Sequence, residues 1–238
     1  MPAGVQGESV ARNYAEALLT LALKAEDAKG WGTMLRQIAN AIETDITLFR
    51  FLESPRIAAD QKSAVLTKAL GTGILATALK KGLLAPDHRQ ALLDSLLRLN
   101  RHAARCMQRF PVHAATDITG FALGGHGAEL ASASQVRLRI DTARLPLLPG
   151  LEAAVAAGCL TRGDASNRLY AGARATVGTG VTTVRGHAVF DPQSSGGLLI
   201  AVAANAADEL VSALREGGDL PATVVGEITT GAPGIAFV

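Results

Sequence analysis

The feature that most restricts the fold is a glycine-rich turn that runs directly into an apolar stretch, DPQSSGGLLIAV at residues 191–202. Residues 198–202 have the length and composition of a strand that is buried on both faces. The small residues of the turn can bring backbone N–H groups close together, which suits a bound phosphate, although many such turns bind nothing. These candidate phosphate-binding residues are Ser194, Ser195, Gly196 and Gly197.

A second stretch of similar character is ATDITGFALGGH at residues 115–126. It reads as a strand that ends at Asp117, followed by Thr119, Gly120 and the start of a glycine-punctuated helix. A carboxylate at a strand end that faces a helix N-terminus can hold a hard cation while nearby N–H groups hold phosphate oxygens. Asp117 or Thr119 can equally serve as a helix cap. We expect His126 to be an ordinary packed histidine, because no partner cluster surrounds it in the sequence.

Composition changes near Gly71. Before it glycine is sparse, and apolar residues such as Tyr14 and Leu18 recur at helical spacing. After it glycine recurs, β-branched runs appear and turn signals multiply. We therefore expect a helical domain over residues 1–70 and, over residues 71–238, a mixed sheet covered by helices.

Local patterns predict the individual elements. Residues 60–70 read as a helix with Gly71 just past its end, and residues 86–105 as one long amphipathic helix. The polar stretch TRGDASNR at residues 161–168 is expected to form a surface loop, and residues 179–190 a β-like segment. Two further helices are expected, a short one that ends at Gly158 and a longer one over residues 205–216. Strands are expected over residues 112–116, 136–140, 223–228 and 235–238.

Charge and composition exclude several classes of protein. The chain of 238 residues is 48% hydrophobic and 18% charged, which is ordinary for a folded domain. Its formal charge of +2 gives no electrostatic case for nucleic acid. Two cysteines, Cys106 and Cys159, make no disulfide framework and have no zinc-type spacing. Without a signal-like N-terminus or a membrane-length apolar run, we expect a cytoplasmic protein.

The first part of the chain resembles the N-terminal domain of the ATP synthase delta subunit. The resemblance rests on ARNYAEALLTLA at residues 11–22 and FLESPRIAADQKSAVL at residues 51–66. It implies a helical bundle, over about residues 8–70, that binds the N-terminal end of an ATP synthase alpha subunit. The last helices of that bundle and the whole C-terminal half of the family are not recognisable.

The rest of the chain, from about residue 66, resembles selenophosphate synthetase (selenide, water dikinase). Four stretches occur in that family's order: LTKALGTGIL, ATDITGFALGGHGAELA, the GD-x-x-NR loop and DPQSSGGLLIAV. The resemblance implies the C-terminal domain of that enzyme, whose fold is shared with aminoimidazole ribonucleotide synthetase. The family makes selenophosphate from selenide and ATP with magnesium, so the implied cofactor is Mg²⁺.

The resemblance also implies roles for particular residues. Asp117 matches a magnesium-ligating aspartate, and Thr119 and Gly120 follow it in register. Ala122 replaces the family's usual glycine, and Gly124 and Gly127 replace larger apolar residues. Any role for Arg168 is left open by the loose match of its loop.

The family's N-terminal half carries the reactive Cys or selenocysteine, the essential lysine, a glycine-rich ATP segment and further metal aspartates. None of these is recognisable before residue 66, so no catalytic residue is assigned. Because phosphoryl transfer needs several charges around one triphosphate, intact phosphotransferase activity is not expected from this chain alone. A crossover within the shared LTK-x-LG string indicates a hybrid chain, whether from recombination or from an assembly error. The alternatives are a delta-like stator adapter and a hybrid without function.

Overall fold

The computed structural model describes residue 27, residues 29–33 and residues 62–238. The chain forms two compact units, Met1–Glu53 and Ser54–Val238. In the first unit, residues 29–33 are helical, and the Asp27 carboxylate accepts a hydrogen bond of 2.9 Å from the backbone N–H of Gly30. The rest of the predicted helical bundle lies outside the described residues.

The described part of the second unit is built on a seven-stranded sheet with the order β2-β5-β1-β6-β3-β7-β4. Pairing is antiparallel from β2 to β3 and parallel from β3 through β7 to β4. The predicted mixed sheet is therefore confirmed. The strands are β1 (Lys62–Leu66), β2 (Val112–Asp117), β3 (Arg137–Ile140), β4 (Ala175–Val177), β5 (Leu198–Ala203), β6 (Thr223–Thr229) and β7 (Gly234–Phe237).

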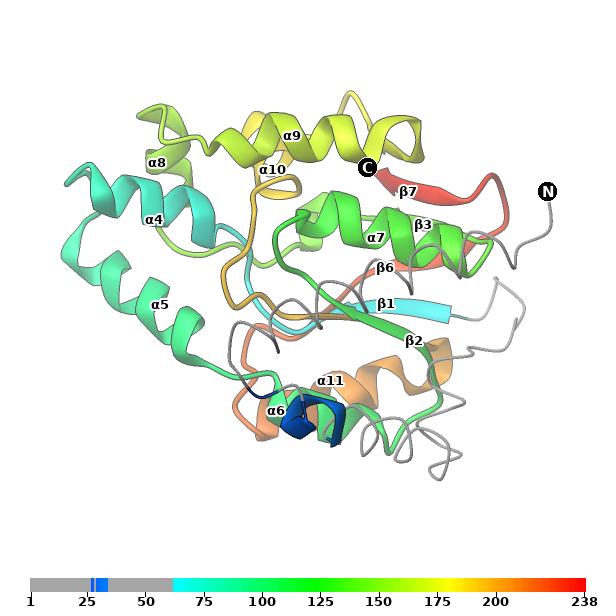
Figure 1. Ribbon diagram of the computed structural model, residues 1–238. Coiled ribbons are helices and arrows are strands. Elements are labelled where there is room, and N and C mark those ends of the chain that lie inside the picture. Colours follow the sequence, from blue (N-terminus) through cyan, green and yellow to red (C-terminus); the bar gives the residue numbers. More distant parts are fainter. Residues whose placement is uncertain (1–26, 28, 34–61) are drawn as a thin grey trace. The chain divides into compact units, whose positions relative to one another are not determined.

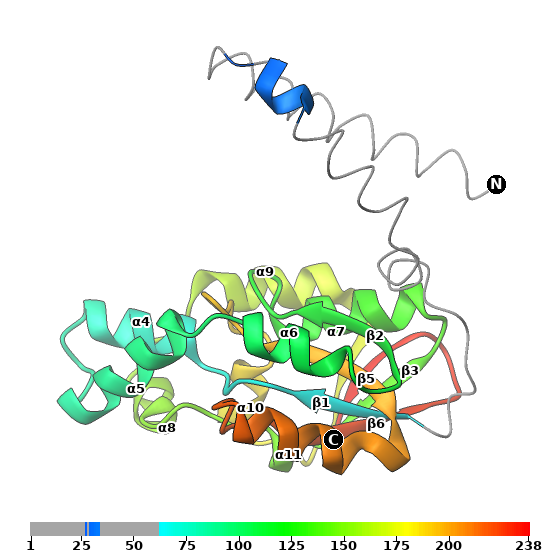
Figure 2. The ribbon, with the colours of Figure 1, turned by 90° about the horizontal axis from the view of Figure 1, so that it is seen from below.

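Helices cover both faces of this sheet. Figure 1 shows α7 and α9 on one side and α6 and α11 on the other, and Figures 1 and 2 both place α4, α5 and α8 at one end. The α-helices are α4 (Thr72–Lys80), α5 (Pro86–Leu97), α6 (Arg101–Met107), α7 (Ala122–Ala133), α8 (Leu151–Ala156), α9 (Arg162–Ala171), α10 (Thr183–Ala188) and α11 (Ala207–Glu216). Short 3₁₀ turns are η2 (Thr142–Arg144), η3 (Gly172–Arg174) and η4 (Ala204–Ala206).

The prediction of a helix over residues 60–70 was wrong for the described residues 62–70. Lys62–Leu66 is a central strand, paired on one side with β5 and on the other with β6. Val65 and Leu66 are fully buried, because the two faces of the strand contribute to two different hydrophobic cores. Alanine at position 69 permits a helix, but burial between two partner strands outweighs that weak local preference.

Three other predicted elements also differ from the structure. The long helix over residues 86–105 is two helices, because the chain turns between Leu97 and Arg101. The predicted surface loop at 161–168 lies almost wholly in α9, and Asp164 and Asn167 are buried there. The β-like segment 179–190 contains α10. The strands predicted at 112–116, 136–140, 198–202, 223–228 and 235–238, and the helix ending at Glu216, are confirmed.

The segment Asp191–Gln193 closes the N-terminus of α4. One carboxylate oxygen of the buried Asp191 accepts the backbone N–H groups of Gly73 at 3.0 Å and Ile74 at 3.2 Å. The side-chain oxygen of Gln193 accepts those of Gly71 at 3.1 Å and Thr72 at 3.2 Å. The first N–H groups of a helix have no partner within the helix, so two side chains from a distant loop satisfy the start of α4.

Lys68 joins a second set of distant segments. Its side-chain nitrogen donates to the backbone oxygens of Arg98 at 2.5 Å, Ser195 at 2.7 Å and Ser95 at 3.5 Å. The residue is buried, and this burial lowers the pKa of its ammonium group, an effect that nearby Asp219 opposes. The contacts tie the end of α5 to the glycine-rich turn.

Replacing Asp191 by asparagine should change how stability depends on pH. Burial raises the pKa of Asp191 from its ordinary value of 3.8 to about 6 in the folded chain. The contribution of this group to stability is therefore fully present below pH 3.8 and is lost as the pH rises through 6. The loss amounts to about 2.4 kcal/mol between pH 4 and pH 7. Urea unfolding at several pH values should show that the free energy of unfolding of Asp191→Asn, relative to that of the parent chain, rises by this amount from pH 4 to pH 7. A difference that stays constant with pH would contradict the assignment.

Replacing Lys68 by methionine should destabilise the second unit by about 2 to 3 kcal/mol, because three partly buried carbonyl groups lose their charged donor. The matched control is Lys80→Met, which removes an exposed lysine of α4 and should change the free energy of unfolding by less than about 0.5 kcal/mol. Urea unfolding followed by circular dichroism measures both. Equal effects of the two substitutions would show that the contacts of Lys68 are not stabilising.

Candidate functional site

The fold brings the two predicted phosphate-site stretches together. Asp117, the last residue of the edge strand β2, lies opposite Leu198, the first residue of β5. The N–H of Ile118 donates to the Gly197 oxygen at 2.8 Å, and the N–H of Gln193 donates to the Thr119 oxygen at 3.0 Å. Asp117 and Gly120 are exposed, so the loop from Asp117 to Gly120 and the turn at 194–197 form one continuous candidate site.

The glycines of the turn have a packing role of their own. A Cβ atom on Gly196 would lie 1.8 Å from the backbone oxygen of Ile118, and one on Gly197 would lie 2.7 Å from the backbone nitrogen of Lys68. The N–H of Ser194 donates to the Thr72 hydroxyl at 3.0 Å and so points into the fold. Close approach of neighbouring chain segments therefore requires both glycines, whether or not the turn holds a phosphate.

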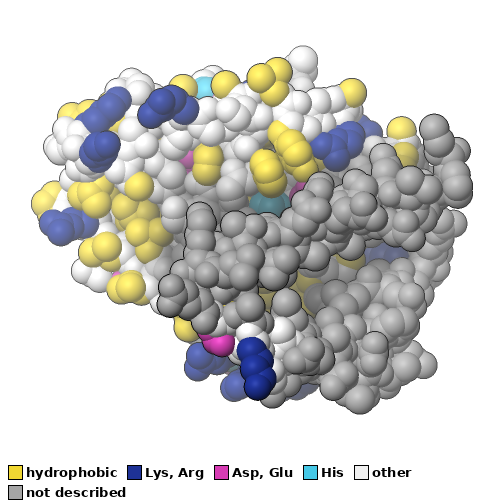
Figure 3. All heavy atoms as spheres, viewed as in Figure 1, with side chains coloured by type: hydrophobic (Ala, Val, Ile, Leu, Met, Phe, Trp, Pro, Cys, Tyr) yellow, Lys and Arg dark blue, Asp and Glu magenta, His cyan; other side chains and the backbone are white. Residues whose placement is uncertain are grey.

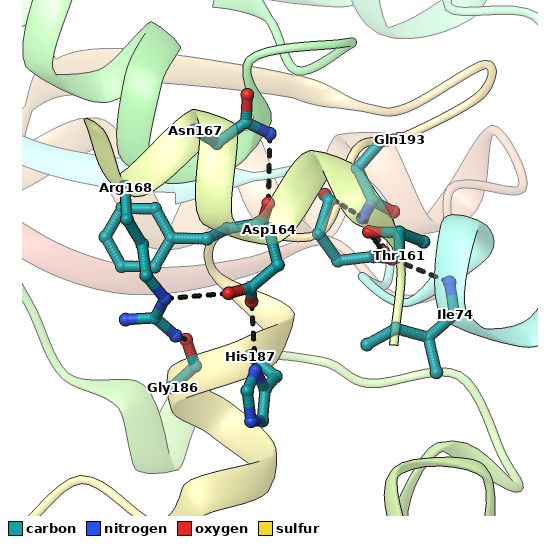
Figure 4. Close-up of polar contacts among 10 residues, drawn as sticks. Ile74, Thr161, Asp164, Asn167, Arg168, Gly186, His187 and Gln193 are labelled. Carbon is teal, nitrogen blue, oxygen red and sulfur yellow. Dashed lines mark hydrogen bonds and ion pairs between the residues drawn. The ribbon is translucent and has the colours of Figure 1, made fainter. Parts of the chain in front are cut away.

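Helix α9 contributes a buried polar cluster that the sequence did not reveal. The two Asp164 oxygens contact Arg168 Nε at 2.8 Å and His187 Nδ1 at 3.0 Å, as Figure 4 shows. Arg168 also lies over the ring of Phe190, with its guanidinium carbon 4.4 Å from the ring centre. These contacts anchor α9 against α10 and give Arg168 a structural place in the fold.

Asn167 and Thr161 connect the same helix to the candidate site. The Asn167 amide donates to the backbone oxygens of Gly120 at 2.9 Å and Phe190 at 3.0 Å. The Thr161 hydroxyl donates to Asp191 at 3.3 Å. The spacing of Thr161 and Asp164 is that of a helix N-cap followed by an acidic third residue, which is the signal that could have predicted α9.

His126, expected to be an ordinary packed histidine, is half-buried and has two polar partners. His126 Nε2 lies 3.0 Å from the Thr119 hydroxyl, and its Nδ1 lies 3.3 Å from Glu129 Oε2. Tyr170 donates a hydrogen bond to the other Glu129 oxygen, and this bond is the main cause that raises the pKa of Tyr170. Helical spacing places His126 and Glu129 one turn apart on α7, and this spacing was the available signal.

Asp117 fits a magnesium ion only in part. Within residue 27, residues 29–33 and residues 62–238, no group of three or more His, Cys, Asp or Glu side chains could hold a metal. Magnesium is commonly held by one or two carboxylates, with phosphate oxygens and water completing its shell. A single exposed carboxylate is therefore suited to an ion that arrives with a phosphate ligand, and not to a tightly held resident ion.

Sequence comparisons identify relatives of both parts of the chain. Over 171 residues the chain is 43% identical to a selenide, water dikinase of Nitratidesulfovibrio vulgaris, covering 71% of this chain and 49% of the relative. It is 76% identical over 71 residues to an ATP synthase subunit delta of Gemmatimonas aurantiaca, covering 30% of this chain and 38% of that relative. The chain thus spans about half the length of the dikinase relative and less of the delta subunit.

Structural comparison agrees with the fold. A thiamine-monophosphate kinase from Stenotrophomonas maltophilia superposes with a TM-score of 0.51 at 23% identity, covering 76% of this chain and 51% of that one. No described helix is both long enough and apolar enough to cross a membrane. The ATP synthase delta (OSCP) subunit family matches residues 10–109. The family described as AIR synthase related protein, C-terminal domain, matches residues 62–238, well over half of the sequence, and the chain belongs to this family.

Proposed function

We propose that residues 62–238 are the metal- and phosphate-facing half of a selenide, water dikinase-type phosphotransferase, which makes selenophosphate from selenide and ATP. The observation that carries this proposal is the 43% identity to a selenide, water dikinase over 171 residues. In support, the loop from Asp117 to Gly120 and the turn at 194–197 lie side by side, joined by backbone hydrogen bonds.

In this proposal Asp117 ligates a magnesium ion that is bound together with the phosphates of ATP. Thr119 and Gly120 contact the phosphate oxygens from one side, and residues 194–197 do so from the other. The ion would neutralise charge on the transferring phosphate. The nucleophile and the other cationic groups of the reaction are not among residues 62–238, so we infer that this half binds the nucleotide but does not turn it over by itself.

Isothermal titration of the full chain with magnesium-ATP tests this binding. The parent chain should give a binding isotherm, and Asp117→Asn should weaken the apparent affinity roughly tenfold or more, because magnesium loses its protein carboxylate. The matched control is Asp208→Asn, which removes an exposed carboxylate from α11 on the other face of the sheet. Absence of heat from the parent chain, or equal affinities for the two variants, would count against the proposal.

A second candidate function belongs to the first part of the chain. Its 76% identity over 71 residues to a delta subunit favours a stator-type adapter that binds the N-terminal end of an ATP synthase alpha subunit. This function concerns residues 8–70, most of which lie outside the described residues.

Trp31 provides a direct probe of the adapter function, because it is the only tryptophan in the chain and lies in the helical stretch 29–33. Titration of the full chain with a peptide from the alpha subunit's N-terminus should change the tryptophan fluorescence in a saturable way. Leu18→Asp, which places a charge in the predicted apolar stripe, should abolish that change. The adapter function would be refuted if the peptide left the tryptophan fluorescence unchanged and a pull-down with the chain captured no peptide.

A further inference from the structure

A line of polar contacts runs from the Glu129 carboxylate through the His126 imidazole to the hydroxyl of Thr119. His126 Nδ1 lies 3.3 Å from the Glu129 carboxylate, and His126 Nε2 lies 3.0 Å from the Thr119 hydroxyl. When the imidazole is neutral and its proton is on Nδ1, on the side of the Glu129 carboxylate, the lone pair of Nε2 faces the hydroxyl. A carboxylate, an imidazole and an alcohol in this order are the groups that activate a nucleophile for acyl transfer.

Neighbouring aromatic side chains hold this line in place. Tyr170 donates a hydrogen bond to the second oxygen of Glu129. The ring of Phe121 stacks on that of Tyr170, with centres 4.2 Å apart, and meets the ring of His126 edge-on at 5.6 Å. His126 is therefore restrained both through the carboxylate and through its ring, and a fixed base is what a nucleophile of this kind requires.

The alcohol lies beside open space and an apolar surface. A Cβ atom added to Gly120, next to Thr119, would meet no atom of the described residues within 4 Å. Phe121, two residues after Thr119, is 44% exposed and stacks on Tyr170, which is 38% exposed, and Figure 3 shows hydrophobic side chains over α7 and α9. The nearby carboxylates of Asp117 and Glu129 disfavour an anionic acyl donor. An uncharged ester with an aromatic group fits both the charge and the apolar surface.

We propose that Thr119 is a nucleophile, activated by His126 and Glu129, that accepts acyl groups from uncharged esters of aromatic alcohols. Thr119 Oγ1 forms a bond to the ester carbonyl carbon, and the bond from that carbon to the alcohol oxygen breaks. The hydroxyl proton passes through His126 Nε2 to the departing alcohol, and a water molecule then releases the acid by the reverse route. The reaction needs no ATP, magnesium or second chain, so it is independent of the dikinase-type function.

The test uses p-nitrophenyl acetate and the full chain. Release of p-nitrophenol should fall at least tenfold in Thr119→Val and in His126→Gln, since a positioned general base contributes about 10²–10⁴-fold to such reactions. Thr119→Ser should retain the activity. The matched control is His102→Gln: His102 also pairs with a carboxylate, Asp219 at 2.9 Å, but it is not part of this line and its loss should leave the rate unchanged.

Mass spectrometry of the acid-quenched reaction locates the acyl group. An acetyl group on Thr119 of the parent chain, absent from His126→Gln, would support the proposal. Acetylation confined to lysine or histidine side chains would overturn it, as would equal rates for the parent chain and His126→Gln. If Thr119→Val fails to fold, as judged by near-ultraviolet circular dichroism, the location of the label and the rates of Thr119→Ser and His126→Gln still decide the outcome.

Discussion

The closure of α4 by Asp191 and Gln193 is the interaction on which the rest of the second unit depends. A helix that begins in the interior must find partners for its first N–H groups, and here two side chains from a loop about 120 residues away supply them. Burying a carboxylate is unfavourable, and the raised pKa of Asp191 reflects this, while the hydrogen bonds it accepts offset part of the cost. Once the cap is in place, the glycine-rich turn and the start of β5 have little freedom.

That constraint links all four stretches that the sequence singled out. Gln193 contacts the backbone of Thr119, Asp191 accepts a hydrogen bond from Thr161, and Lys68 holds the oxygen of Ser195. The four stretches are therefore hydrogen-bonded to one another and stabilise the fold, whether or not a ligand is bound. The residues that remain exposed after these contacts are made, Asp117 and Gly120 above all, are those available for binding. The turn therefore has a role in the fold through Ser194, whose N–H points inward, in addition to any role in binding.

Sequence patterns predicted the elements whose burial is encoded locally. The apolar run of β5 and the alternation in β3 predict strands directly, and the structure agrees. Strand β1 was missed because its short apolar run also fits a helix, and only its two partner strands decide between them. Helix α9 was missed because its polar residues are satisfied by distant groups, which makes a buried helix look like a surface loop. In the candidate site, the sequence singled out Asp117 and the turn as predictions, and the fold brings the two stretches together. The helical spacing of His126 and Glu129 was a weaker signal, and the contact of His126 with Thr119 became evident only in three dimensions.

The differences from the family pattern have physical reasons of their own. Ala122 stands where the resemblance places glycine, and its φ of 61° is a conformation that costs an alanine about 1 kcal/mol. Gly124 and Gly127 let α7 approach Phe190 and Ile235, since a Cβ atom at either position would lie within 2.6 Å of those side chains. Smaller residues on α7 thus allow a closer packing of helix on sheet than larger ones would.

The matches to the two families overlap over residues 62–109. In the structure, the start of this overlap has the fold of the AIR synthase related C-terminal domain. Strand β1 lies in the middle of the sheet, and residues 71–74 receive the cap from Asp191 and Gln193. The same residues cannot at once be a helix of a delta-type bundle. Residues 62–66 form a strand and not a helix, because the free energy gained by burying a central strand on both faces exceeds that gained from helix propensity. A helix of a delta-type bundle is therefore excluded for residues 62–66 in this structure.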